Sequence, residues 1–171
     1  MLKCFLIQAI VCCACFHIII TYSVKKAPMS WFYDYPKAVQ ERMRSLPEYT
    51  GKIPSSNFNL KKKIISAAFC VAFLICMAWI AGTRSFGGTM AYSFSLWTVI
   101  NFYDALVLDT IWFCHNKKIR FHGTEDLAPV YENPKKHWVD FLIGTIIGVQ
   151  FNAPFILTVD WLGWICYQLL N

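Results

Sequence analysis

The chain has 171 residues, of which 57% are hydrophobic, 17% aromatic and only 15% charged. This composition is too apolar for a soluble domain of that length, so it excludes the water-soluble class and predicts an integral membrane protein. The formal net charge is +6, but no nucleic-acid-reading motif accompanies the basic residues. We therefore expect the lipid bilayer, and no nucleic acid, as a partner.

The first predicted element is a transmembrane helix over about residues 2–23, in which Lys3 is the only charged residue. About 20 apolar residues are enough to cross a ~30 Å hydrocarbon core. A cleaved signal peptide is the alternative. Cleavage would place the next loop, with its nine basic residues, outside the membrane, and no good cleavage region is present. We therefore favour an uncleaved helix.

A long loop over about residues 24–63 follows, and it contains one short predicted helix. Pro36 can open a helix at its first position, and Val39, Met43 and Leu46 follow it at helical spacing. Four aromatic residues stand just before Pro36. This pattern is typical of a short amphipathic helix at the cytoplasmic interface behind an aromatic belt, and a partner-binding helix is the alternative.

Three more transmembrane helices are predicted over about residues 64–83, 91–114 and 139–169. The link over 84–89 is short and contains Gly87 and Gly88, so it predicts a helical hairpin. A second loop covers about residues 115–138. The last stretch is longer than a simple crossing needs, and Pro154 predicts a kink or break within it.

The basic residues are distributed unevenly between the two sides of these predicted helices. Only Lys3 and Arg84 lie outside the two long loops. By the positive-inside rule, both loops are expected in the cytoplasm and both termini outside. The fold class is therefore predicted as all-α: a four-helix transmembrane bundle that forms a single membrane domain over residues 1–171.

The best functional lead is the pair Asp104 and Asp109, which stands inside the apolar stretch 91–114. On membrane-insertion scales a central Asp costs roughly 2.5–3.5 kcal/mol, while each Leu, Ile, Phe or Val returns about 0.3–0.6 kcal/mol. Partner helices must therefore cover the two acids. On an ideal α-helix Asn101 lies within an arc of about 140° with both acids, so all three can face the bundle interior.

Such a pair can serve as a proton relay, as cation or metal ligands, as acid/base groups, or as counter-ions of a cationic substrate. A hydrogen-bonded brace between helices is the alternative. The last predicted helix offers partners, because Gly144 and Gly148 form a GxxxG pattern that permits close approach of another backbone. Close approach would bring Gln150 or Asn152 to the depth of Asp104.

A second candidate group lies in the loop over 115–138 and consists of His115, His122, Glu125 and His137. These residues could gather as acid/base groups or metal ligands at the cytoplasmic face. No standard zinc-binding spacing is present, so no metal site is predicted, and the sequence indicates no particular cofactor. A turn or helix cap at Thr124 is the alternative for this region.

Parts of the chain resemble a group of small bacterial integral membrane proteins of unassigned function. The residues that carry the resemblance are Asn101-Phe102-Tyr103-Asp104 through Leu108-Asp109, then Gly123-Thr124-Glu125-Asp126, Tyr131 and His137. The resemblance covers roughly residues 35–148. It implies a multi-pass protein of the bacterial inner membrane and implies no activity.

We therefore predict a binding or transport-type protein with a proton- or cation-responsive intramembrane acidic centre. Asp104 and Asp109 would form that centre, supported by Asn101, Gln150 and Asn152. A membrane enzyme that acts at the cytoplasmic face on a lipid or quinone substrate is one alternative, and an accessory subunit of a membrane complex is another. Because a chain of this size has few helices with which to enclose a pathway, we expect a homo-oligomer or a partner membrane protein.

Overall fold

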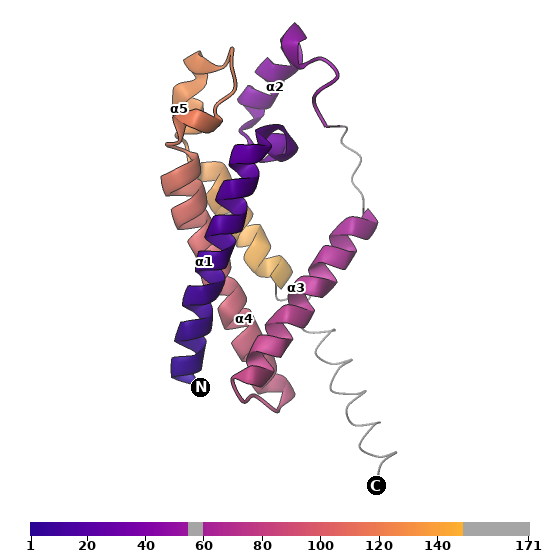
Figure 1. The fold of residues 1–171 in the computed structure, drawn as a ribbon, viewed down its shortest axis with the longest axis vertical. Coiled ribbons are helices and arrows are strands. Elements are labelled where there is room, and N and C mark those ends of the chain that lie inside the picture. Colours follow the sequence, from indigo (N-terminus) through magenta and orange to yellow (C-terminus); the bar gives the residue numbers. More distant parts are fainter. Residues whose placement is uncertain (55–59, 149–171) are drawn as a thin grey trace. The chain divides into compact units, whose positions relative to one another are not determined.

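The computed structural model describes residues 1–54 and 60–148, and the side chains of the second range from residue 65 onward (Figure 1). All regular elements in these residues are helical, which confirms the all-α class. The predicted break at Pro154 and the predicted partners Gln150 and Asn152 lie outside the described residues.

The long helices begin close to the predicted bounds, and the first three also end close to them, whereas the predicted end of the fourth lies outside the described residues. They are α1 (Leu2–Lys26), α3 (Leu60–Ile80), α4 (Phe86–Tyr103), which continues into the π-helix η3 (Asp104–Phe113), and a helix over 135–148. The loops hold the short elements η1 (Pro28–Asp34), α2 (Lys37–Ser45), η2 (Pro47–Tyr49), η4 (Lys117–Ile119), η5 (Glu125–Leu127) and α5 (Ala128–Tyr131).

Among the described residues, α1 alone is both long enough and apolar enough to cross a membrane. A signal sequence near the N-terminus would pass the same test. The uninterrupted apolar part of α3, Ile65–Ile80, is shorter than a full crossing. One possible membrane helix is therefore shown, and the four-helix bundle stays a prediction.

Contacts divide the chain into two compact units. Unit 1 is made of Met1–Cys12, Phe58–Asn101 and Leu142–Asn171, and unit 2 is made of Cys13–Asn57 and Phe102–Phe141. The expectation of a single membrane domain stays a prediction.

In unit 1, α3 and α4 form the predicted hairpin through a turn over 81–85 in which Gly82 has φ +96°. Leu74 and Ala78 of α3 pack with Leu96 of α4 in the core of this unit. The Ser93 hydroxyl donates a hydrogen bond to the carbonyl oxygen of Leu74 at 3.3 Å. The buried hydroxyl of Ser93 is thus satisfied by the neighbouring helix, as a predominantly apolar core requires.

In unit 2, the two long loops share one hydrophobic core. Tyr35 is completely buried, and its hydroxyl donates to the carbonyl oxygen of Ile119 at 2.8 Å. The predicted short helix is confirmed as α2, which buries Val39 and Met43 as their i, i+4 spacing requires and packs against α5 (Figure 1).

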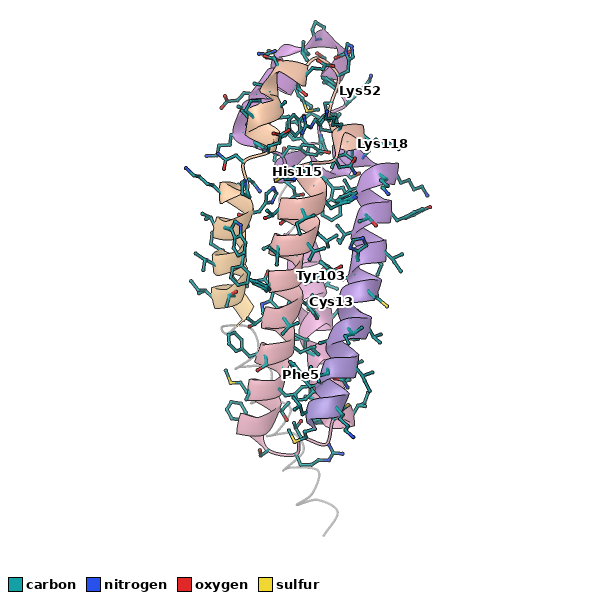
Figure 2. The ribbon with its side chains drawn as sticks, turned by 90° about the vertical axis from the view of Figure 1, so that its left-hand side faces the viewer. Phe5, Cys13, Lys52, Tyr103, His115 and Lys118 are labelled. Carbon is teal, nitrogen blue, oxygen red and sulfur yellow. The ribbon has the colours of Figure 1, made fainter. Side chains whose placement is uncertain are left out.

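Helix α1 adds a polar contact to unit 2. His17 Nδ1 and the Tyr103 hydroxyl are 3.0 Å apart and form a hydrogen bond (Figure 2, Tyr103 labelled). A histidine inside an apolar helix is costly unless it is paired. This pairing assigns His17 a structural role.

The Gly-Thr-Glu-Asp run of the second loop, residues 123–126, holds this loop against α2, and we call it the clasp. Gly123 has φ +76°, and the buried Thr124 hydroxyl lies 2.9 Å from the Tyr131 hydroxyl and donates to the Phe121 carbonyl at 2.6 Å. Asp126 accepts two hydrogen bonds from the Arg42 guanidinium, at 3.1 and 2.9 Å. The run therefore fastens the second loop to α2.

Replacing Gly123 by Ala is expected to lower the free energy of unfolding by about 1–3 kcal/mol, because a positive φ strains any residue with a Cβ. The added Cβ would also stand only 2.7 Å from Leu46 Cδ1. Gly51→Ala is the matched control, since Gly51 has φ +77° with no neighbour within 4 Å. Denaturant unfolding should show a larger loss of free energy of unfolding for Gly123→Ala than for Gly51→Ala. Equal losses would contradict a structural role for the clasp.

Candidate functional site

The two acids singled out in the sequence lie on successive turns of the π-helix η3. A π-helix repeats its hydrogen bonds at i→i+5 rather than i→i+4, and the Cys114 N–H accordingly donates to the Asp109 carbonyl at 3.0 Å. On an α-helix, residues five apart diverge by about 140°. The wider turn brings the Asp104 and Asp109 side chains closer to one face, and both line the same cavity.

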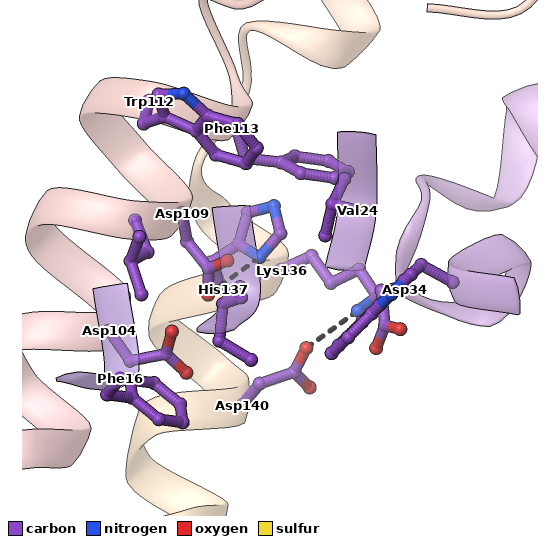
Figure 3. Close-up of a pocket in the computed structure, with 13 residues that line it drawn as sticks. Phe16, Val24, Asp34, Asp104, Asp109, Trp112, Phe113, Lys136, His137 and Asp140 are labelled. Atoms are coloured by element: carbon purple, nitrogen blue, oxygen red, sulfur yellow. Dashed lines mark hydrogen bonds and ion pairs between the residues drawn. The ribbon is translucent and has the colours of Figure 1, made fainter. Parts of the chain in front are cut away.

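This cavity lies within unit 2 and has a volume of about 380 Å³ (Figure 3). Its walls come from the second half of α1, from η1, from η3 and from the first turns of the helix over 135–148. The lining residues are Phe16, Ile20, Val24, Trp31, Asp34, Asp104, Leu108, Asp109, Trp112, Phe113, Lys136, His137 and Asp140. We call this space the acidic cavity.

His137 and Asp109 form a buried pair on one wall of the acidic cavity. His137 Nδ1 lies 3.1 Å from Asp109 Oδ2, and the side chain of His137 is 5% exposed. Burial alone would lower the pKa of His137. Its hydrogen bonds with Asp109 and Cys114 outweigh burial and raise the pKa to about 9. His137 is therefore an imidazolium at neutral pH, held in place by a carboxylate.

Lys136 and Asp140 form a second pair, with Lys136 Nζ 2.7 Å from Asp140 Oδ2. They are four residues apart on one helix, the spacing at which opposite charges meet. Figure 3 shows the two pairs on neighbouring parts of the acidic cavity, with Asp34, from the end of η1, beside Lys136. Asp34 and Asp140 are exposed, whereas Asp104 and Asp109 are partly buried.

Among the described residues, neither Asp104 nor Asp34 accepts a hydrogen bond or forms an ion pair, and of these two acids only Asp104 is partly buried. Asp104 and Phe16 both line the acidic cavity (Figure 3). The charged groups within electrostatic range of Asp104 are Asp109, His137 and Asp34. An unpaired carboxylate in a cavity with aromatic walls is costly and is a common mark of a binding site.

Asn101, the third predicted member of the intramembrane centre, belongs to unit 1. Its side-chain amide donates to the Thr145 hydroxyl at 3.0 Å. The atoms nearest to the GxxxG glycines belong to side chains and not to another backbone, since a Cβ on Gly144 would stand 3.2 Å from Asn101 Oδ1; the close approach of another backbone stays a prediction. Trp97 Nε1 also donates to the Gly144 carbonyl, at 3.1 Å. Asn101 thus holds two helices together.

The four candidates of the second loop are not brought together. His115 bonds to the carbonyl of Thr110 at 3.0 Å, and His122 faces Glu48 at 3.3 Å. The exposed Glu125 accepts from the Gly123 N–H at 3.0 Å, and backbone hydrogen bonds hold the pKa of this carboxyl below its usual range. Of the four, His137 alone lines the acidic cavity.

Within the described ranges, 1–54 and 60–148, no group of three or more His, Cys, Asp or Glu side chains is placed to hold a metal ion.

Three charged residues of the acidic cavity, Asp34, Lys136 and Asp140, were not predicted as site residues. The i, i+4 pattern of Lys136 and Asp140 is a sequence signal for an ion pair. No comparable sequence signal marks Asp34. It reaches the helix over 135–148 only through the fold of the first loop, which local spacing does not reveal.

No family model, no curated protein and no solved structure matches this chain. The fold and the site together define a class: an all-α protein that has, in the part of the chain that the structure describes, one possible membrane helix and a cavity lined by carboxylates, a buried His–Asp pair and aromatic side chains.

Proposed function

We propose that this chain is a small multi-pass membrane protein whose acidic cavity binds a proton or a cation in a binding or transport-type role. The observation that carries the proposal is the convergence of Asp104 and Asp109 on one cavity through the π-helix. Segments of π-helix are rare and are often found at functional sites.

Exposed apolar side chains support the membrane part of the proposal. Large hydrophobic residues are exposed on each predicted crossing, for example Ile7 (63%), Phe69 (76%), Ile111 (59%) and Ile146 (61%). Soluble monomers rarely leave so many large apolar side chains in water. A lipid environment would bury them and would leave both basic loops on the cytoplasmic side of a bacterial inner membrane.

The charges of the acidic cavity support the cation part. Four aspartates line it against two basic residues, Lys136 and His137. Both basic groups are engaged by single carboxylates, which leaves an excess of negative charge. A cavity with low-dielectric walls strengthens the attraction of a cation to such an excess.

The buried His137–Asp109 pair favours a second candidate function, a membrane enzyme. A histidine oriented by a carboxylate is a common general acid/base arrangement, and the pair faces a cavity of small-molecule size. In this candidate His137 would exchange a proton with a bound lipid or quinone. Turnover that requires His137, with no response to cations, would favour the enzyme.

The proposed topology predicts opposite sides for two glycine turns. An epitope inserted after Gly82 should be accessible from outside intact bacterial spheroplasts, and one inserted after Gly51 should be accessible only after permeabilisation. Both turns have space around the glycine, so either insertion should preserve the fold. Exposure of Gly51 on intact spheroplasts would contradict the topology.

Proton release on cation binding tests the function directly. Purified protein in a weakly buffered solution with a pH-indicator dye should bind added cations and release protons. The double variant Asp104→Asn with Asp109→Asn should do neither, because the acids that hold the proton and the cation are absent.

Asp126→Asn is the matched control, since Asp126 belongs to the clasp and does not line the acidic cavity. Its response should equal that of the native protein. A full response in the double variant would contradict the proposed function.

A further inference from the structure

We infer that the acidic cavity is a binding site for a small organic ammonium ion, with the cationic group placed against Asp104. This inference rests on the proposed function and names the class of cation. It depends on three features of the cavity: a partly buried carboxylate with no bonded partner among the described residues, aromatic walls, and an alkylammonium group already accommodated inside.

The unpaired carboxylate supplies the charge. Asp109 is engaged by His137 at 3.1 Å and Asp140 by Lys136 at 2.7 Å, whereas no described residue is bonded to Asp104. An added cation would displace no existing pair when it meets Asp104. It would also relieve the repulsion between Asp104 and Asp109, which lie one π-turn apart.

Aromatic walls supply the rest of the site. Phe16, Trp31 and Trp112 line the cavity together with the acids. Aromatic faces attract alkylated ammonium groups and bury their methyl or methylene surface at the same time. The ring of Trp112 attracts a cation elsewhere in the fold, because Lys25, which does not line the cavity, has its Nζ 5.8 Å from the ring centroid.

The side chains of the cavity favour an organic cation over an inorganic one. A hard metal ion needs several oxygen ligands at roughly 2.0–2.6 Å. Among the described side chains no such group of three acids, histidines or cysteines exists. An organic ammonium ion needs one carboxylate and apolar contact, and Lys136 is a primary ammonium that already enters the cavity (Figure 3).

The volume is also suited to a small organic molecule. About 380 Å³ stands near the lower end of the roughly 300–1,000 Å³ seen for small-molecule sites. A compact ammonium compound would fill such a space, whereas a single hydrated inorganic ion would leave most of the aromatic wall unused.

Equilibrium binding of radiolabelled choline to the purified full-length protein tests the inference. Choline serves as the probe because 3,3-dimethylbutan-1-ol has the same shape without the charge. We expect saturable binding that excess tetramethylammonium displaces and the neutral alcohol does not. Asp104→Asn should weaken binding at least about tenfold, because it removes the facing charge.

Two further variants complete the experiment: Trp112→Phe tests the aromatic wall, and Asp126→Asn is the control. Trp112→Phe should weaken binding several-fold, since the indole face is the stronger cation partner, and Asp126→Asn should bind as the native protein does. Undiminished binding in Asp104→Asn, or equal displacement by the neutral alcohol, would overturn the inference. Absence of choline and tetramethylammonium binding from a protein that still releases protons on addition of metal ions would overturn it and leave the proposed function in place.

Discussion

Replacing His137 by Gln is expected to lower the free energy of unfolding by about 2–4 kcal/mol at pH 6.5. The side chain of His137 is 5% exposed, and Asp109 is its charged partner, at 3.1 Å. Removal of one member leaves a partly buried carboxylate without its counter-charge, which is among the more costly single changes in a protein.

The same pair predicts how stability depends on pH. The folded-state pKa of His137 is raised to about 9, against about 6.5 in an unfolded chain. A group whose pKa is raised on folding stabilises the fold fully below the unfolded pKa and loses that contribution as the pH rises through the folded pKa. The contribution of the pair should therefore be complete below about pH 6.5 and disappear between about pH 6.5 and 9.

Unfolding of the purified protein at several pH values measures both effects. The difference between native protein and His137→Gln should be large at pH 6.5 and small above pH 9. His122→Gln is the matched control, because His122 faces a carboxylate at a similar distance but its side chain is 83% exposed. A constant difference at all pH values would show that His137 acts through packing alone.

Asp104→Asn is expected to leave the fold intact or to stabilise it by about 0.5–2 kcal/mol while weakening the response to cations at least about tenfold. Asp104 has no partner among the described residues and stands near Asp109. The amide therefore loses no contact and relieves a repulsion between two carboxylates. Opposite effects on stability and on function are typical of a binding site.

The combined effect of Asp104→Asn on stability and on the cation response distinguishes a binding site in the acidic cavity from a structural brace between helices. If Asp104 only joined helices, its Asn variant would unfold more easily and would respond to cations normally when folded. Thermal unfolding with and without added tetramethylammonium measures both properties in one series. Loss of stability without loss of the cation response would favour the accessory-subunit alternative.

The importance of Asp104 and Asp109 could be predicted from the sequence, because an acid in an apolar helix is costly wherever the helix lies. Their arrangement could not. An α-helix turns by 100° for each residue, whereas the run from Asp104 to Phe113 forms a π-helix, for which its sequence has no signal. On an α-helix the side chains of Asp104 and Asp109 would point about 140° apart, and the wider turn of the π-helix brings both to the wall of one cavity.

In the second loop, the roles of the candidate residues could not be predicted from the sequence. Its polar residues could be recognised as unusual, yet their roles depend on contacts between two loops far apart in the chain. Thr124 bonds with Tyr131, and Asp126 with Arg42 of α2. Both contacts are structural, and of the predicted loop cluster His137 alone reaches the acidic cavity. Local spacing holds no information on such long-range pairing.

Difference infrared spectroscopy of the purified protein tests the central claim most directly, since it detects the carboxyl group of Asp104 itself. Spectra recorded before and after addition of tetramethylammonium should contain carboxyl bands that change on binding, and these bands should be absent from Asp104→Asn and retained in Asp126→Asn. Carboxyl bands that do not change in the native protein, or the same changes in Asp104→Asn, would contradict a cation site at Asp104.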